Sequence, residues 1–426
     1  MPTPTDLPRR RLLRQALAAA AAGTLGVQRS VTWAAPAAAG NSGAPAGPID
    51  TRLLVVFLRG AYDAANVVIP LGTPFYAESR PNIAIAPPGP GADCALPLNA
   101  DWGLAPALRE TLWPRVQAGE VAFVPFAGIN DLSRSHFETQ DRLELGQPSP
   151  GDDGYSPRHV GAPDGFLNRL AQVLDLRLEA EGGVMAFSDH VPLVLQGARS
   201  VPNIALGSLG RGGLDARQVA LVERMYRGDA LAARVHEGLA TRDEVMREMA
   251  DEMTAANRNA ITTRGFELEA RRVAKLMREQ VRIGFIDVGG WDTHVGQGGA
   301  TGALANRLGE LGRGLASFAG EMGPDWSRSV VVVVSEFGRT FRENGNRGTD
   351  HGHGTAYWVL GGGVRGGVRG EQVRLAAPTL NQGRDWPVLN EARGLLGGLF
   401  GRLYGLDAAA LQRVFPGAVP RDIGLV

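Results

Sequence analysis

The sequence contains a single cysteine, Cys94, among 426 residues. One cysteine excludes an internal disulfide and is too few for a zinc–thiolate centre. We interpret Cys94 as a small apolar residue of a loop. A metal or catalytic site in this chain would therefore be built from histidine, carboxylate and hydroxyl side chains.

Net charge is also absent, because 44 Lys and Arg residues balance 44 Asp and Glu residues. Zero formal charge gives no electrostatic reason to expect a nucleic-acid partner or an anionic membrane surface. The basic residues are nearly all arginine, and alanine, glycine and proline are abundant. We attribute this bias to genome composition rather than to function.

The sequence lacks a strongly apolar run of the length that a membrane span needs, about 20 residues. The nearest candidate is the alanine-rich stretch 16–27, which follows the arginine-rich segment 9–14. A paired arginine followed by apolar and basic residues resembles a twin-arginine export signal. We predict a signal peptide over residues 1–39 and a flexible linker over residues 40–50, so that the mature protein has no stable transmembrane span.

An export signal of this kind predicts a periplasmic or secreted protein that meets the twin-arginine translocase during export. The pathway carries folded proteins, often with a cofactor already loaded, so it is a mild indication of a metal or cofactor. The alternative is that the N-terminal segment is simply basic and has no export role.

Apolar runs alternate with segments of helical periodicity along the rest of the chain. β-Branched residues favour strands, and an uninterrupted apolar run is typical of a strand buried on both faces. The predicted core strands are residues 53–58, 120–126, 281–287, 330–334 and 355–360. The apolar spacing predicts helices at residues 104–116, 165–178, 304–322, 390–404 and 407–415.

Shorter features complete the predicted organisation. Weaker strand signals lie at residues 184–186, 192–195 and 368–375, and polar loops at residues 70–103 and 147–163. Charged, periodic sequence over residues 214–282 predicts several amphipathic helices. We therefore predict an α/β fold, with a mostly parallel sheet sandwiched by helices, as a single domain over residues 51–426 with a helical insertion at about 214–280.

Polar residues follow the predicted strands where each strand ends. Asp63 follows the first strand, Asp292 and His294 follow the third, and Glu336 follows the valine run. Ligands bind at the carboxyl ends of strands in open α/β sheets. Carboxylate and imidazole suit zinc, manganese or iron, whereas the alternative for Asp63 and for the Asp292–His294 loop is a turn held by Asx hydrogen bonds.

The loop before the last core strand adds three more candidate ligands. It contains Asp350, His351 and His353 within four positions. The strand that follows them places this loop in the same polar region as Glu336. We predict that these side chains contribute to one metal site.

A serine begins a predicted helix after the second core strand. Ser133 and Ser135 follow a glycine-containing loop, a geometry that suits an activated hydroxyl because helix-start amides favour negative charge. The alternative is a capping box between Ser135 and Glu138, in which the serine only closes the helix. The sequence leaves both interpretations open.

Five segments of the chain resemble the DUF1501 family: FLRGAYDAANVVIP, SRSHFETQD, GGWDTH, VVVVVSEFGRTFRENGNRGTDHGHG and GRDWP. The resemblance extends from about Leu53 to the C-terminal helices. Members of that family are mostly exported, carry twin-arginine signals and are largely uncharacterised. The family is grouped with the alkaline phosphatase and sulfatase superfamily, which implies a mixed, mostly parallel sheet between helices.

The resemblance also implies site roles, position by position. It implies metal ligands at Asp63, Asp292, His294 and His351 or His353. It implies a nucleophile at Ser135 or Ser133. Glu336 departs from the superfamily pattern, because it occupies a strand end where an Asp-His or Asp-Asn pair is expected.

Two functions fit these features. The first is a metal-dependent hydrolase of small-molecule phosphate or sulfate esters, with zinc as the first choice of divalent metal and manganese, calcium or iron as alternatives. Arg134 or Arg339 would bind the oxyanion, because arginine matches phosphate and sulfate geometry. The second is a non-catalytic exported protein that keeps the fold and binds a protein partner at the cell surface.

Overall fold

The computed structural model describes residues 50–148, 164–176, 183–205, 224–227, 231–232, 235 and 265–426. The predicted signal peptide and nearly all of the predicted linker lie outside these residues. So does most of the predicted helical insertion, of which the described part is mainly the last helix. Among the described residues, no helix has the length and apolar character that a membrane crossing requires.

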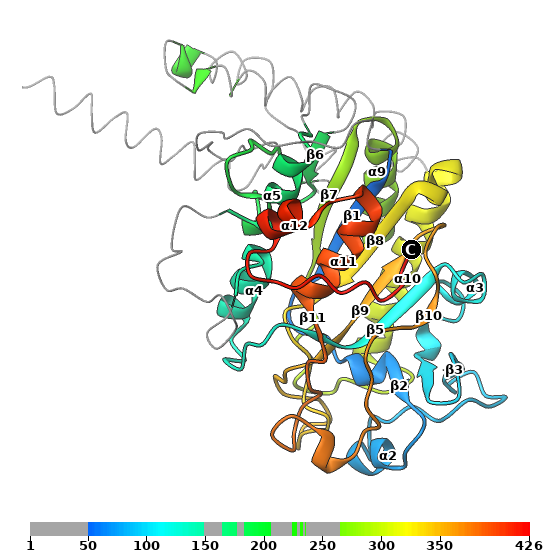
Figure 1. The fold of residues 1–426 in the computed structure, drawn as a ribbon. Helices are drawn as coiled ribbons and strands as arrows, with labels where there is room; N and C mark the ends of the chain where they lie inside the picture. The colour runs from blue at the N-terminus through cyan, green and yellow to red at the C-terminus, as the bar shows by residue number, and fades with distance from the viewer. Residues whose placement is uncertain are drawn as a thin grey trace, which may run out of the picture.

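A mostly parallel sheet forms the centre of the molecule (Figure 1). Its strands run in the order β10-β5-β9-β8-β1-β7-β6, with β11 also paired to β5. Strand β9 is antiparallel to β5 and to β8, and the other pairs are parallel. The bounds are β1 Arg52–Leu58, β5 Val121–Gly128, β6 Gly183–Ala186, β7 Val281–Val288, β8 Ser329–Val334, β9 Thr355–Leu360, β10 Gly367–Val368 and β11 Asn390–Glu391.

Helices cover both faces of this sheet, which confirms the predicted α/β class. Helices α9 (Phe266–Glu279) and α10 (Ala303–Met322) pack on each other against one face. Helices α5 (Phe166–Val173), α11 (Ala392–Tyr404) and α12 (Ala408–Val414) cover the other face (Figure 1). The short helix α4 (His136–Leu145) follows β5.

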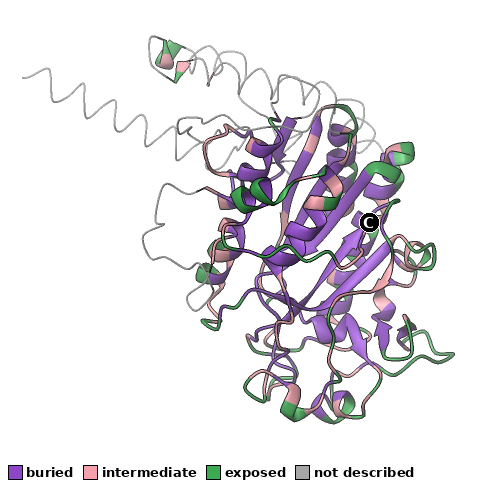
Figure 2. Cartoon of the chain, viewed as in Figure 1, coloured by how far each residue is buried: buried purple, intermediate pink, exposed green. Residues whose placement is uncertain are grey.

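The sheet has one hydrophobic core on each of its faces, and these two cores explain why its central strands are so apolar. Alternate residues of β1 point to opposite faces, so Val56 belongs to the core under α9 and α10 and Val55 to the core under α5 and α11. Every residue of β1 and of β8 is buried (Figure 2). A strand that is covered on both sides has no position for an exposed polar side chain.

The predicted helix at residues 104–116 is wrong. Leu104 ends strand β4 (Trp102–Leu104), which forms a small antiparallel sheet with β2 (Val68–Pro70) and β3 (Leu96–Pro97). A 3-10 turn at Pro106–Leu108 and the short helix α3 (Trp113–Gln117) follow. Each begins with a proline within its first two positions, and proline lacks the N–H that a continuous helix needs.

Three other local predictions also differ from the structure. Residues 193–195 form a 3-10 turn rather than a strand, and of residues 368–375 only the first belongs to a strand, β10. The expected loop at 70–103 contains helix α2 (Phe75–Ser79) and strand β3. Short apolar runs do not distinguish these alternatives, because tertiary packing decides them.

The sheet topology brings distant loops to one edge. Strands β1, β5, β7 and β8 run in the same direction, so their carboxyl ends lie at the same edge of the sheet. Strand β9 runs the opposite way and therefore begins at that edge. The loops 59–63, 129–135, 289–294 and 335–354 consequently meet there.

Glu269 on α9 makes the stability of the fold depend on pH. Burial, together with the nearby carboxylates of Asp287 and Glu310, raises the pKa of Glu269 from its usual 4.5 to about 7, although Arg272 lowers it. Between pH 4.5 and about 7, Glu269 therefore keeps its proton in the folded protein but has lost it in the unfolded chain. We expect the free energy of unfolding to fall as pH rises from about 4.5 to 7, by an amount on the order of 2 kcal/mol.

The substitution Glu269→Gln removes this ionisation and tests its effect. Above pH 7 the variant should unfold at higher urea concentration than the wild type, and the difference should close as pH falls toward 5. Glu279→Gln, at the exposed end of the same helix, is the matched control and should leave the midpoint unchanged. A constant difference between Glu269→Gln and wild type from pH 5 to 8 would contradict the assignment.

Candidate metal centre

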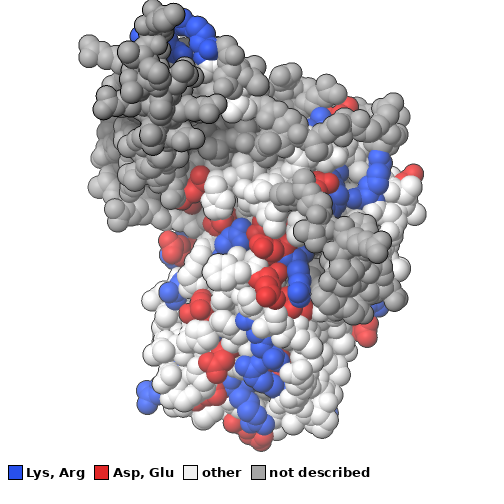
Figure 3. Space-filling view, turned by 90° about the vertical axis from the view of Figure 1, so that its left-hand side faces the viewer, with Lys and Arg blue, Asp and Glu red and all other residues white. Residues whose placement is uncertain are grey.

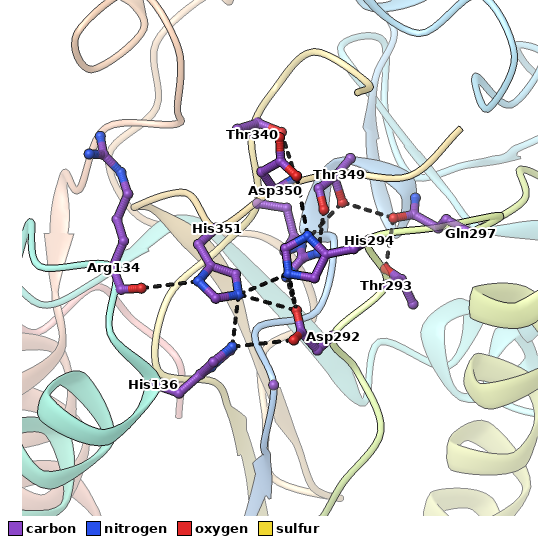
Figure 4. A network of polar contacts seen from close by, with 12 residues as sticks. Arg134, His136, Asp292, Thr293, His294, Gln297, Thr340, Thr349, Asp350 and His351 are labelled. Atoms are coloured by element: carbon purple, nitrogen blue, oxygen red, sulfur yellow. Dashed lines mark hydrogen bonds and ion pairs between the residues drawn. The ribbon is translucent and has the colours of Figure 1, made fainter. Parts of the chain in front are cut away.

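Three side chains from different segments of the chain converge at the common edge of the sheet (Figure 4). His136 starts α4, Asp292 follows β7, and His351 precedes β9. One potential ligand atom from each lies within 4.8 Å of the others. The His136 Nε2 and His351 Nε2 atoms are 2.9 Å apart, and His351 Nε2 lies 3.3 Å from Asp292 Oδ1.

His294 adds a fourth donor beside this group. Its Nε2 atom lies 2.9 Å from Asp292 Oδ1 and 3.1 Å from His351 Nε2 (Figure 4). The structure thus brings together Asp292, His294 and His351, which the sequence predicted as ligands. We refer to His136, Asp292, His294 and His351 as the His/Asp cluster.

Each imidazole of the cluster is held by an acceptor on its other nitrogen. His136 Nδ1 lies 2.7 Å from Glu336 Oε1, and His294 Nδ1 lies 3.2 Å from Asp350 Oδ1. His351 Nδ1 lies 3.0 Å from the backbone carbonyl of Arg134. Carboxylates and carbonyls only accept hydrogen bonds, so each Nδ1 carries a hydrogen, and in the neutral imidazole Nε2 then presents a lone pair.

Converging lone pairs require a positive charge between them. Two neutral Nε2 atoms 2.9 Å apart cannot form a hydrogen bond when both hydrogens are on Nδ1. A zinc ion with nitrogen ligands at 2.0–2.1 Å in a tetrahedron separates those ligands by about 3.3 Å. The observed separations of 2.9–3.3 Å among His351, its histidine neighbours and Asp292 therefore suit a divalent metal.

The pKa shifts of two cluster histidines have opposite directions. The hydrogen bond that His136 donates to Glu336 raises the pKa of His136 above its usual value, despite partial burial. Burial and the neighbouring His136 lower the pKa of His351. A proton bound to one imidazole thus disfavours a proton on the next.

Glu336 was predicted as a metal ligand, but the structure makes it the carboxylate that orients His136. It is buried, and its Oε1 atom also accepts hydrogen bonds from the Gly60 amide and from Gln140, both at 2.9 Å. Burial alone would raise its pKa, but the hydrogen bonds from His136, Gln140 and Gly60 lower it. Metal-binding histidines commonly have such a carboxylate behind them. Asp350 has the same position behind His294.

The two arginines predicted to bind an oxyanion already have carboxylate partners. Arg339 donates to Asp292 Oδ1 at 2.5 Å and to the side chain and carbonyl of Thr349. Arg134 donates to the buried carboxylate of Asp385 at 2.8 Å. The Arg339 guanidinium thus fixes Asp292. Arg134 contacts the cluster only through its backbone carbonyl, at His351, while its guanidinium pairs with Asp385.

Asp63 and His353 were predicted as ligands and lie outside the His/Asp cluster. Asp63 is fully buried in an ion pair with Arg80, with an Oδ2–NH1 distance of 2.5 Å. His353 is buried, and its Nδ1 lies 3.2 Å from the carbonyl of Asp131. Burial lowers the pKa of His353, so it is the neutral imidazole that packs there.

A family model described as "Protein of unknown function (DUF1501)" matches residues 129–415, which is more than half of the chain. The chain belongs to the DUF1501 family. No curated protein matches the sequence. Among solved structures, the chain is similar to a protein in the alkaline phosphatase superfamily from Vibrio parahaemolyticus, at 10% identity and a TM-score of 0.39, over 87% of this chain and 69% of that one.

His136 is the cluster residue of this DUF1501 protein that sequence reasoning missed. It lies within the segment SRSHFETQD, directly after the serine that was considered as a nucleophile. The signal was its place at a helix start after a core strand, which is the same position that drew attention to Ser135. Its ring stacks on Phe337, with centroids 4.9 Å apart, so it is supported from the Glu336 loop as well.

The two candidate serines differ in their surroundings. Ser133 Oγ donates to Asp131 Oδ2 at 3.1 Å and lies 3.3 Å from Thr139 Oγ1, so it is part of a polar turn. Ser135 is the residue before α4, and its side chain makes no capping hydrogen bond. The capping-box alternative is therefore wrong for Ser135, and its hydroxyl remains next to His136 in the chain.

The charge pattern of the surface agrees with the zero net charge. Basic and acidic side chains lie beside one another over the described surface in Figure 3.

Proposed function

We propose that this DUF1501 protein is an exported metal-dependent hydrolase of phosphate or sulfate esters. The observation that carries the proposal is the convergence of three imidazole lone pairs and one carboxylate, each fixed by a hydrogen-bonding partner outside the cluster. A metal bound there would act as a Lewis acid and would lower the pKa of a neighbouring hydroxyl. The segment 9–14, with its paired arginines, supports export.

The residues at this edge of the sheet would serve as metal ligands, as groups that orient those ligands, and as the nucleophile. His136, His351, Asp292 and His294 would hold the metal, and zinc suits nitrogen and carboxylate donors best, with manganese, calcium or iron as alternatives. Glu336, Asp350 and the Arg134 carbonyl keep the imidazoles in the tautomer that binds metal. Ser135 is the nucleophile candidate, because it adjoins a ligand and its hydroxyl is not used as a cap.

The number of donors in the His/Asp cluster favours the non-catalytic alternative. If all three imidazoles and Asp292 bind a single zinc ion, the tetrahedron is full, and closed sites of this kind are structural. The protein would then keep the metal to stabilise the edge of the sheet and would act through a protein partner. The hydrogen bond from Arg339 to Asp292 Oδ1 argues for an open position, because it competes with metal for that oxygen.

The test measures metal content and turnover on protein exported through its native route. We expect about one metal per chain, and hydrolysis of p-nitrophenyl phosphate or p-nitrophenyl sulfate. Ser135→Ala should lower kcat at least about 100-fold while the metal is retained. Ser133→Ala is the matched control and should stay close to wild type. Full metal occupancy without turnover on either ester would favour the non-catalytic function instead.

A further inference from the structure

Gln297 lies behind the His/Asp cluster, between the loop that carries Asp292 and helix α10. Its side chain is fully buried. Its backbone amide donates to the carbonyl of Arg347 at 2.9 Å, and its carbonyl accepts from Leu304 at 3.0 Å. A buried amide side chain in a loop needs partners for both of its ends, because an unmet polar group in the interior is costly.

The amide nitrogen of Gln297 has an anionic partner. Nε2 donates to Asp63 Oδ2 at 2.6 Å, and that carboxylate is paired with the buried Arg80. Because a carboxylate only accepts hydrogen bonds, the amide group can have just one orientation. Its oxygen must therefore face the opposite side, toward the ligand loops.

The amide oxygen of Gln297 joins the two loops that carry the ligands (Figure 4). It accepts hydrogen bonds from Thr293 Oγ1 at 2.8 Å and from Thr349 Oγ1 at 2.9 Å. Thr293 lies between Asp292 and His294 in the chain. Thr349 comes two residues before His351. One oxygen thus links the loop after β7 to the loop before β9.

We propose that Gln297 is a positioning residue that sets the spacing between the two ligand loops for a divalent cation. The inference rests on the proposed metal centre and adds a determinant of its affinity. Only a side chain with a donor at one end and an acceptor at the other can both donate to the Asp63 carboxylate and accept from the two threonine hydroxyls. In this proposal Asp63 holds the amide of Gln297 in place and does not bind the metal itself.

The test compares Gln297→Leu with the wild-type full chain. Leucine has a similar size but makes none of the three hydrogen bonds. We expect the Kd for Zn²⁺, measured by competition with a chromophoric chelator, to rise about 10- to 100-fold, as for other residues behind metal ligands. The visible absorption spectrum of the Co²⁺-substituted variant should also change, because the ligand geometry is altered.

The matched control is Asn168→Leu. Asn168 is another fully buried amide that bridges loop carbonyls, at Leu195 and Arg199, on the α5 side of the sheet. The Asn168→Leu variant should be less stable than the wild type and yet keep the wild-type Zn²⁺ affinity and Co²⁺ spectrum. This separates positioning of the metal site from a general loss of packing.

A second variant covers the case in which Gln297→Leu does not fold. Thr293→Val removes one hydrogen bond to Gln297 Oε1 with almost no change of shape, and it should raise the Zn²⁺ Kd in the same direction. Wild-type affinity and spectrum in folded Gln297→Leu, or in Thr293→Val if only that variant folds, would overturn the inference and leave the proposed function standing. Absence of Zn²⁺ binding by the wild type would overturn both.

Discussion

Replacing His351 with alanine is expected to weaken Zn²⁺ binding by more than 100-fold, whereas replacing His353 is expected to change it little. His351 presents Nε2 to His136, His294 and Asp292 within 2.9–3.3 Å. Loss of a residue behind a ligand already costs 10- to 100-fold in affinity, so loss of a ligand should cost more. His353 contacts the Asp131 carbonyl instead and lies outside the His/Asp cluster.

The two histidines make a matched pair, because they are two residues apart in one loop and were equivalent candidates in the sequence. Metal content by mass spectrometry and Zn²⁺ titration would be measured on both variants, with thermal unfolding as the check on folding. His353→Ala should lower the unfolding temperature, since a buried ring is removed, and still bind metal. Metal loss in His353→Ala together with full retention in His351→Ala would show that the cluster is misassigned.

Replacing Asp63 with alanine is expected to lower the free energy of unfolding by about 3–5 kcal/mol, the usual cost of leaving one member of a buried ion pair alone. Both side chains are buried, and Arg80 contacts both carboxylate oxygens, at 2.5 and 3.0 Å. Without Asp63 the guanidinium would keep its charge in the interior with no anion beside it. The same change also removes the anchor of Gln297.

A double-mutant cycle with Arg80→Met measures the pair directly. The two single changes should each be strongly destabilising, and the double variant should be less destabilised than their sum by about 1–3 kcal/mol. Recovery should be partial, because Arg80 also donates to the carbonyls of Thr340 and Phe341. Asp422→Ala, which removes an exposed pair with Arg402, should change stability by less than about 1 kcal/mol.

The cycle also decides between two roles for Asp63. A metal ligand at this position would lose metal on substitution while Arg80→Met kept it, and the two changes would add without coupling. Strong coupling, with only the moderate loss of Zn²⁺ affinity expected from displacing Gln297, supports the ion pair. Additive effects would contradict it.

The fold could be predicted where a segment is apolar at successive positions, because such a segment forms a strand that is buried on both faces of the sheet. The valine run 330–334 and the segment 53–58 are apolar throughout, and each became a fully buried strand. Segment 281–287 is interrupted by Arg282 and Asp287, and these two are only half-buried in strand β7. The predicted helix at 104–116 was wrong because prolines and the pairing of Leu104 with Val68 overrode its apolar spacing. Periodicity alone contains no information about such a partner strand.

The site could be predicted in part for a similar reason. The sequence placed Asp292 and His294 after one strand and His351 before another. Strands β1, β7 and β8 are parallel and β9 is antiparallel to β8, so the end of β7 and the start of β9 lie at one edge. The sequence could not tell that His351 lies in the His/Asp cluster while His353 lies outside it, or that Glu336 and Asp350 form hydrogen bonds to imidazoles of the cluster. These distinctions depend on where single side-chain atoms point, and a strand-end position does not fix that direction.

The amino-acid sequence by itself determined the α/β class, the order of the main strands and helices along the chain, and which edge of the sheet would carry polar chemistry. Those follow from local apolar patterns and from the rule that parallel strands share a carboxyl edge. Only the tertiary structure decided that His136 joins the cluster, that Asp63 pairs with Arg80, and that Gln297 joins two ligand loops. Apart from the contact between Gln297 and Thr293, these contacts link residues more than fifteen positions apart, so their distances are set by the packed fold and not by the chain.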